Sequence, residues 1–171
     1  NLEREVSTVL ARSQTGEINN FPVAENVHVN GILHTTTVPS IISDQQVQTA
    51  IQMADKIADA LGYVGVMAVE FFASKEGDLL VNEIAPRPHN SGHFTLDACP
   101  TSQFEQQVRM LCGLPSGNCE LSSAVVMVNL LGDVWGDSQP NWDTLLARPE
   151  NHLHLYGKKE ARPGRKMGHY N

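Results

Sequence analysis

Two glutamates in neighbouring predicted strands are the residues whose spacing most directly suggests chemistry. Residues 63–72 and 79–85 are apolar runs separated by the turn sequence KEGD, and a turn of even length would place Glu70 directly opposite Glu83. Cross-strand partners have Cβ atoms roughly 5 Å apart, where two like charges destabilise a sheet unless a counter-charge lies between them. Mg²⁺ is commonly held by one or two carboxylates together with substrate phosphates, so the pair predicts a magnesium site.

Two alternatives to a metal site remain open for this pair. The first is that both glutamates point to solvent on an exposed sheet face, as isolated strand glutamates usually do. Four apolar residues are predicted to share the face of Glu70 and would keep it from being freely wet: Val66, Ala68, Phe72 and Val81. A three-residue loop with a bulge would also shift the register by one residue and send the two carboxylates to opposite faces of the sheet.

The second of these strands runs into a polar loop, NEIAPRPHNSGH. Pro86 and Pro88 lack amide donors and end strand pairing. The polar residues that the loop would display beside the proposed metal are Arg87, His89, Asn90, Ser91 and His93. His89 and His93 do not predict a zinc pair, because Pro88 and Gly92 disrupt the helix that such spacing requires. The alternative is a loop that is polar only because it is exposed.

A cluster of positive charge lies near the end of this acidic chain. The five cations between positions 158 and 166 are Lys158, Lys159, Arg162, Arg165 and Lys166. Pro163 and Gly164 would shape a turn among them, and such a cluster is suited to gripping a phosphate. A solvated loop and a nucleic-acid contact are the alternatives, and no interleaved aromatic platform supports the second.

Composition restricts the class of protein. The 171 residues, 41% of them hydrophobic, can bury a core, and the net charge of -7 argues against a general nucleic-acid or membrane-surface role. Cys99, Cys112 and Cys119 form no metal-type pair and cannot all be disulfide-bonded, which favours the cytoplasm. No apolar run reaches the ~18 residues of a membrane helix. The chain begins at Asn1, inside a predicted strand, which suggests a piece of a longer protein.

Most elements that would position these groups are antiparallel strands. Residues 5–12 and 21–38 have strand patterns, and Asn30-Gly31 predicts a tight hairpin because both turn positions need positive φ. The remaining predicted strands, besides the two that carry the glutamates, are 124–131 and 152–156. With two helices, these strands indicate an α+β class dominated by antiparallel sheet.

The two predicted helices carry capping signals. Ser43 and Gln46 make a capping box, after which apolar residues recur at helical spacing until Gly62. Ser102 and Glu105 begin the second helix in the same way. The inner face of this second helix is predicted to consist of Phe104, Val108, Leu111 and Cys112.

With these pieces assembled, the chain resembles the 5-(carboxyamino)imidazole ribonucleotide synthetases, an ATP-grasp family of purine biosynthesis. The resemblance covers nearly all of the chain and rests on EREVS, GYVGVMAVEFF, NEIAPRPHNSGH, SQFEQQVR and RPGRKMGH. It implies the C-terminal part of such an enzyme, with the N-terminal domain and most of the ATP lid upstream. Residues 1–115 would be the C-terminal part of the ATP-grasp domain, an antiparallel sheet with packed helices. Residues 116–171 would form a small, β-rich domain that completes the substrate site.

The resemblance also implies an activity. ATP would phosphorylate bicarbonate to carboxyphosphate, and the amine of 5-aminoimidazole ribonucleotide would capture the carboxyl group, leaving ADP and phosphate. The full-length protein would be a cytoplasmic homodimer that binds neither nucleic acid nor membrane, and this piece alone would be inactive.

Individual residues receive roles by the same resemblance. Glu70 and Glu83 would be the Mg²⁺ ligands, with Glu83 also contacting the nucleotide. Glu5 would contact the ATP ribose, and His28 and Asn82 would line the nucleotide pocket. The residues facing bicarbonate and the imidazole ribonucleotide would be Arg87, His89, Asn90 and Ser91, the first three in catalytic roles. The ribonucleotide phosphate would be held by Lys158 and Arg165, with Lys159, Arg162 and Lys166 as basic background.

One departure from the wider pattern concerns Ala85. Many ATP-grasp proteins carry Asn at this position as a further metal ligand, so coordination here would depend more on water and phosphate. Two other functions stay open: a different ATP-grasp carboxylate-amine ligase, and a non-catalytic ligand-binding fragment.

Overall fold

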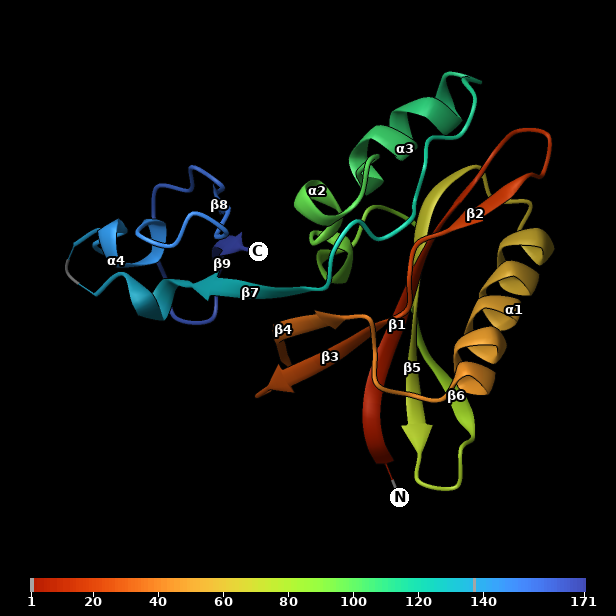
Figure 1. Cartoon of the computed structure of the whole chain (residues 1–171), viewed down its shortest axis with the longest axis horizontal. Coiled ribbons are helices and arrows are strands. Elements are labelled where there is room, and N and C mark those ends of the chain that lie inside the picture. The colour runs from red at the N-terminus through yellow and green to blue at the C-terminus, as the bar shows by residue number, and fades with distance from the viewer. Residues whose placement is uncertain (1, 137) are drawn as a thin grey trace.

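The computed structural model describes residues 2–136 and 138–171, and its strands join into one nine-stranded sheet (Figure 1). The strand order is β6-β5-β1-β3-β4-β7-β9-β8, with β2 paired to β1, and the paired strands run antiparallel. The strands are β1 Leu2–Arg12, β2 Ile18–Asn20, β3 Ala24–Val29, β4 Ile32–Val38, β5 Gly65–Ser74, β6 Leu79–Ala85, β7 Val125–Leu131, β8 Leu153–Leu155 and β9 Lys166–Tyr170. This arrangement confirms the predicted α+β class with an antiparallel sheet.

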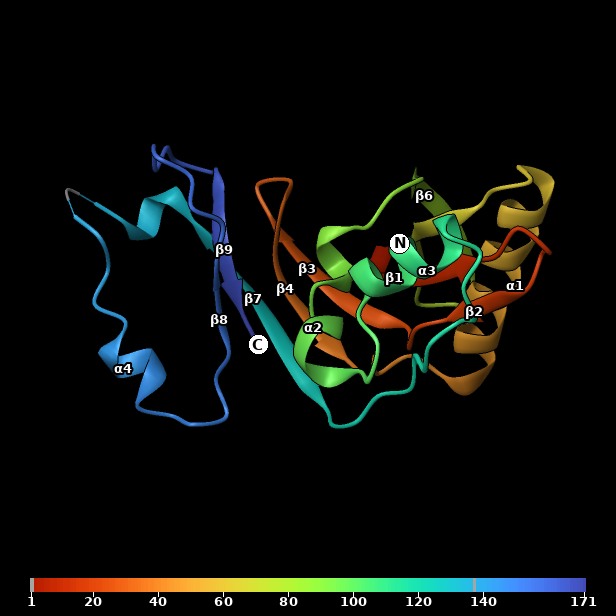
Figure 2. The ribbon, with the colours of Figure 1, turned by 90° about the horizontal axis from the view of Figure 1, so that it is seen from above.

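Helices cover both faces of the strands β1 and β5. The helical elements are α1 Asp44–Ala60, α2 Thr95–Ala98, α3 Gln103–Leu111 and α4 Asp143–Leu146, with the short 3-10 helices η1 Asn90–Gly92 and η2 Gly132–Val134. On one face, α1 packs Ala50, Ala54 and Ala58 against a buried cluster that includes Leu10 and Phe71. Figures 1 and 2 show α1 on one side of these strands and the α2–α3 segment on the other.

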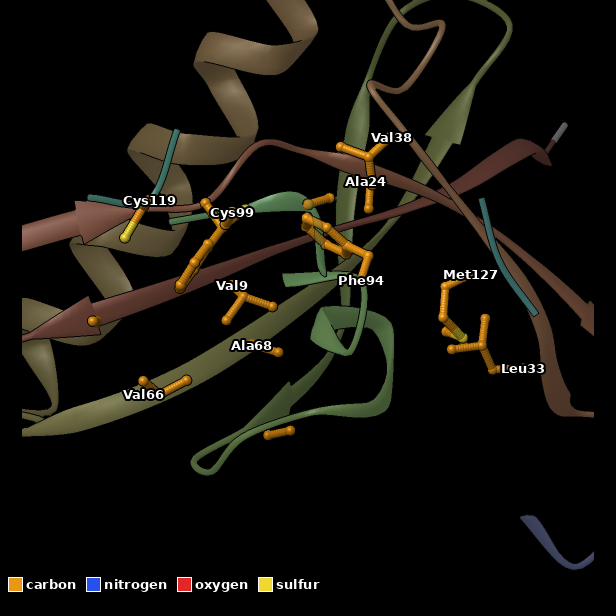
Figure 3. Close-up of a cluster of buried hydrophobic side chains, with 14 of the residues drawn as sticks. Val9, Ala24, Leu33, Val38, Val66, Ala68, Phe94, Cys99, Cys119 and Met127 are labelled. Carbon is orange, nitrogen blue, oxygen red and sulfur yellow. The ribbon is translucent and has the colours of Figure 1, made fainter. Parts of the chain in front are cut away.

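The opposite face of β1 and β5 carries the second core cluster (Figure 3). Val9 and Ala68 come from the sheet, and Phe94 comes from the segment between η1 and α2. Strand side chains alternate between faces, so Glu70, two residues after Ala68, lies on this second face. The candidate site therefore begins where this apolar core ends.

The long helix α1 forms as the sequence predicts. The Ser43 hydroxyl accepts a hydrogen bond from the Gln46 backbone N–H, and Gln46 Oε1 accepts one from the Ser43 backbone N–H, which completes the capping box. The hairpin between β3 and β4 is also confirmed, with φ of 52° at Asn30 and 74° at Gly31.

The predicted inner face of α3 is wrong. Phe104, Val108 and Leu111 are exposed by 39%, 56% and 55%, and Cys112 is exposed as well. The buried residues of α3 are instead Gln103, Gln106 and Met110. Burying a polar group is tolerated only when it is hydrogen-bonded, and both glutamine amides bond to loop backbone, as Gln106 does to Gly117.

The sheet runs without interruption into the C-terminal part of the chain, because β4 pairs with β7. The proposed boundary between residues 115 and 116 falls in the connection between α3 and β7, and this division into two domains stays a prediction. Among the described residues, none of the helices has the length and apolar character needed to cross a bilayer.

Candidate active site

Glu70 on β5 and Glu83 on β6 are register partners, as the sequence predicts. The prediction reached this pairing through a wrong premise, because the hairpin loop has odd length: Ala73 pairs with Leu79, and Phe71 with Val81. A bulge between the Phe71 and Glu70 pairs then leaves Asn82 as the extra residue and restores the Glu70–Glu83 pairing. The bulge also puts Val81 on the face of Phe71 rather than that of Glu70, contrary to expectation.

The Glu70 carboxylate has an environment that suits a cation. The residue is only 8% exposed, and its Oε1 atom has no hydrogen-bond partner. Burial raises the pKa of Glu70, and the charges of Glu83 and Glu5 raise it further, whereas His28 and Lys166 lower it. A buried carboxylate oxygen without a partner is costly, so this position is prepared for a positive ligand.

Glu5 on β1 and His28 on β3 approach the same carboxylate from the neighbouring strands. The two side chains contact each other through Glu5 Oε2 and His28 Nδ1. Asn82 is exposed at the bulge of β6, an edge strand of the sheet. The structure thus brings Glu5, His28 and Glu70 together, with Asn82 at the neighbouring edge.

His89 reaches Glu70 from the polar loop, with 3.7 Å between its Nδ1 and Glu70 Oε1. Burial lowers the pKa of His89 to about 4, and Arg87, Lys166 and His28 add to this shift, so the ring is neutral at pH 7. The Ser91 backbone N–H donates to His89 Nδ1, and the Ser91 hydroxyl lies 2.9 Å from it. Because a backbone N–H can only donate, this arrangement favours the tautomer with its proton on Nε2.

Asn90 makes a reciprocal amide pair with Asn129 of β7. Asn90 Nδ2 donates to Asn129 Oδ1 at 2.9 Å, and Asn129 Nδ2 donates back to Asn90 Oδ1 at 2.7 Å. Asn129 is 4% exposed and also donates to the Leu33 carbonyl. Sequence reasoning missed Asn129, because nothing local in β7 reveals its pairing. The Asn90 amide keeps one N–H and one lone pair for a ligand.

Three of the five cations between positions 158 and 166 already make contacts within the protein. The Lys158 ammonium donates to the Lys166 carbonyl and lies 5.4 Å from the centre of the Tyr156 ring. Arg165 donates to the Glu160 carbonyl at 3.0 Å, and Arg162 pairs with the Glu160 carboxylate.

Lys166, which the sequence analysis assigned to the basic background, carries a charge that acts on the Glu70 carboxylate. Burial lowers the pKa of Lys166, Glu70 opposes that shift, and Arg87 and Lys158 add to it. It is the first residue of β9 and the register partner of Leu131 on β7. This sheet pairing brings the end of the chain beside the end of the polar loop, where Asn171 Nδ2 donates to the His93 carbonyl. No local sequence pattern reveals this neighbourhood.

Comparison with known proteins identifies the family. The sequence model of the ATP-grasp domain matches residues 1–104, more than half of the chain. The chain belongs to the ATP-grasp family. A second model, the phosphoribosylaminoimidazole carboxylase C-terminal domain, matches residues 125–171.

Individual ATP-grasp proteins resemble the chain closely. It is 52% identical over 167 residues to the N5-carboxyaminoimidazole ribonucleotide synthase of Brucella melitensis, covering 98% of this chain and 45% of that protein. The crystal structure of N5-carboxyaminoimidazole ribonucleotide synthetase from Thermus thermophilus superposes with a TM-score of 0.91 at 43% identity, covering 99% of this chain and 46% of that one.

A structure with ligands is also among the relatives. The N5-carboxyaminoimidazole synthase from Aspergillus clavatus, in complex with ADP and 5-aminoimidazole ribonucleotide, superposes with a TM-score of 0.85 at 31% identity. It covers 99% of this chain and 46% of that one. The chain therefore spans less than half the length of these ATP-grasp relatives.

Proposed function

We propose that this chain forms the C-terminal part of an ATP-dependent ligase that carboxylates 5-aminoimidazole ribonucleotide with bicarbonate, releasing ADP and phosphate. The observation that carries the proposal is the convergence of Glu70, Glu83, His89 and Lys166 in a chain 52% identical to an N5-carboxyaminoimidazole ribonucleotide synthase. A place in cytoplasmic purine biosynthesis and a homodimeric full-length protein belong to the same proposal.

Mg²⁺ fits the residues that are present. Glu70 offers an unpartnered, buried Oε1, and Glu83 is its register partner, so the two carboxylates would hold the ion through oxygen donors. Among residues 2–136 and 138–171, no group of three or more His, Cys, Asp or Glu side chains is placed to hold a metal, so phosphate and water oxygens would supply the remaining ligands. When bound, Mg²⁺ would neutralise charge on the ATP phosphates.

The residues of the polar loop would orient the small substrates. Neutral His89, with Nε2–H as its donor, would align an oxygen of bicarbonate without adding a positive charge beside the metal. Arg87 is exposed, and its guanidinium would supply a planar contact to the carboxylate that is transferred. Asn90 would offer its remaining amide N–H, and Ser91, which is fully buried, would keep the His89 ring in place.

The nucleotide and the ribonucleotide phosphate would bind on either side of this loop. Glu5 would accept from the ATP ribose, with His28 and Asn82 beside the nucleotide. Lys158 and Arg165 each donate one N–H to a backbone carbonyl, and their remaining N–H donors would hold the phosphate monoester.

An assay of the full-length protein tests the proposal. We expect ADP release that requires both bicarbonate and 5-aminoimidazole ribonucleotide, and we expect formate not to replace bicarbonate. ADP release that needs neither substrate, or that proceeds with formate, would contradict this activity and favour another ATP-grasp ligase. No nucleotide turnover with any of them would favour a non-catalytic binding protein.

Replacing Lys166 by Met is expected to lower kcat/KM by about tenfold, equivalent to about 1.4 kcal/mol in the transition state. The cause would be the loss of a half-buried positive charge that favours the ionised form of Glu70, in a site where the reacting groups would be negative. Lys159→Met, which removes an exposed cation seven positions away, is the matched control and should retain activity. Equal activities of the two variants would leave Lys166 without a role in the site.

A further inference from the structure

The segment from His89 to His93 is held by one buried side chain outside the loop, Gln103. This residue opens α3 and is 0% exposed. Its Oε1 accepts from the His89 backbone N–H at 2.9 Å, and its Nε2 donates to the His89 carbonyl at 2.7 Å. A single amide thus satisfies both backbone groups of His89, as a partner strand would. Pro86 and Pro88 have ended the strand ladder just before this point, so no neighbouring strand can do so.

The same glutamine also reaches the far end of the segment. Gln103 Nε2 lies 2.9 Å from His93 Nδ1, and the Gln103 backbone N–H donates to the Thr95 hydroxyl at 3.0 Å. That hydroxyl donates to the Gly92 carbonyl at 2.7 Å. The start of α3 is therefore tied to the segment at three of its five residues.

The absence of a side chain at Gly92 leaves room for the Gln103 amide. A Cβ atom at position 92 would lie 2.6 Å from Gln103 Oε1 and 2.8 Å from Gln103 Cδ, closer than real Cβ contacts. The need for glycine therefore comes from the close approach of Gln103 rather than from backbone conformation. The two residues form a matched pair.

We infer that Gln103 is a positioning residue: it sets the backbone of His89–Gly92 and thereby holds the His89 ring beside Glu70. The importance of this geometry for turnover rests on the proposed function. Gln103 does not touch the reacting atoms in this arrangement, and it acts only through the loop. Its removal would leave the His89 N–H and C=O without partners and free the loop to adopt other conformations.

The first experiment measures steady-state kinetics of Gln103→Ala in the full-length protein. We expect kcat/KM for 5-aminoimidazole ribonucleotide to fall about tenfold or more, while KM for ATP changes less than about twofold. The matched control is Gln107→Ala, which removes from the same helix an amide that accepts from Val66 N–H, away from the loop. A general structural role would affect both variants alike. Equal losses in the two variants, or an unchanged Gln103→Ala enzyme, would overturn the inference.

A second experiment tests the contact between Gln103 and Gly92 without measuring activity. Gly92→Ala should lower the melting temperature of the wild-type protein, and the same change should cost much less in the Gln103→Ala background, where the clashing atoms are gone. Hydrogen exchange of the His89 amide should accelerate in Gln103→Ala, whereas amides of β5 stay protected. Additive effects of the two substitutions, or unchanged exchange at His89, would overturn the inference even if the ligase activity is established. An inactive wild-type protein would instead contradict the proposed function. The melting temperatures and the hydrogen exchange would still show whether Gln103 fixes the backbone of the loop.

Discussion

Replacing Glu83 by Gln is expected to lower ATP turnover in the full-length protein by at least about 100-fold, with the fold intact. The substitution keeps nearly the same shape but removes one of the two carboxylates that would hold Mg²⁺, an ion worth several kcal/mol of charge stabilisation in phosphoryl transfer. Glu83 is exposed, so its replacement leaves no unsatisfied group in the core. It also removes a negative charge that adds to the effect of burial in raising the pKa of Glu70.

The matched control for this variant is Glu76→Gln. Glu76 is exposed in the loop of the same β5–β6 hairpin, six residues after Glu70, and takes no part in the proposed site. We expect Glu76→Gln to turn over ATP at the wild-type rate and both variants to melt at or above the wild-type temperature in the absence of metal. Wild-type turnover in Glu83→Gln would remove Glu83 from the metal site.

Acid is expected to destabilise the folded protein through two histidines, the buried His169 and the half-buried His93. Burial lowers the pKa of His169 to about 3 and that of His93 to about 4, from an ordinary value of 6.5. Their ring centres lie 5.0 Å apart. Below pH 6.5 these two histidines bind protons in the unfolded chain but stay neutral in the folded protein. The free energy of unfolding therefore falls as the pH drops, by up to about 1.4 kcal/mol per pH unit for each histidine. This loss continues down to the lowered pKa values.

The surroundings of His169 determine the size of this effect. His154 of β8 stacks on it at 4.6 Å, and Tyr156 shares a 2.8 Å hydrogen bond with its Nδ1. The charge of Asp97 on α2 opposes the lowering of its pKa, and His93 and His154 add to it. His169 Nε2 has no hydrogen-bond partner, so a proton added at this atom would find no acceptor.

Urea denaturation of His169→Gln between pH 7 and 4.5 tests this expectation. The variant should start from a lower stability at pH 7, because the stacking is lost, but its stability should fall less steeply with acid than that of the wild type. His34→Gln, which changes an exposed histidine of β4, should keep the wild-type slope. Parallel slopes for His169→Gln and the wild type would show that His169 takes up its proton equally in both states.

Local sequence signals predicted the elements well where the deciding interactions are local. The capping box of Ser43 and the Asn30-Gly31 turn involve residues within four positions of each other, and both form as expected. The strand bounds 79–85 are also reproduced. The Glu70–Glu83 pairing was predicted correctly only because an odd loop and a bulge compensate for each other.

The errors concern residues whose partners are distant in the sequence. Apolar spacing suggested that Phe104, Val108 and Leu111 face inward, but α3 buries glutamines whose amides are satisfied by loop backbone. Lys166 and Asn129 belong to the C-terminal part of the sheet, and only the pairing of β4 with β7 and of β7 with β9 brings them to the loop. Such partners cannot be read from periodicity, since they depend on the whole strand order.

The most direct test of the account locates the divalent ion itself. Crystals of the full-length protein grown with ADP and Mn²⁺ in place of Mg²⁺ would give an anomalous difference signal at the metal. We expect a peak in direct contact with carboxylate oxygens of both Glu70 and Glu83 and with an ADP phosphate oxygen. A peak that contacts neither carboxylate, with both glutamates facing water, would contradict the account.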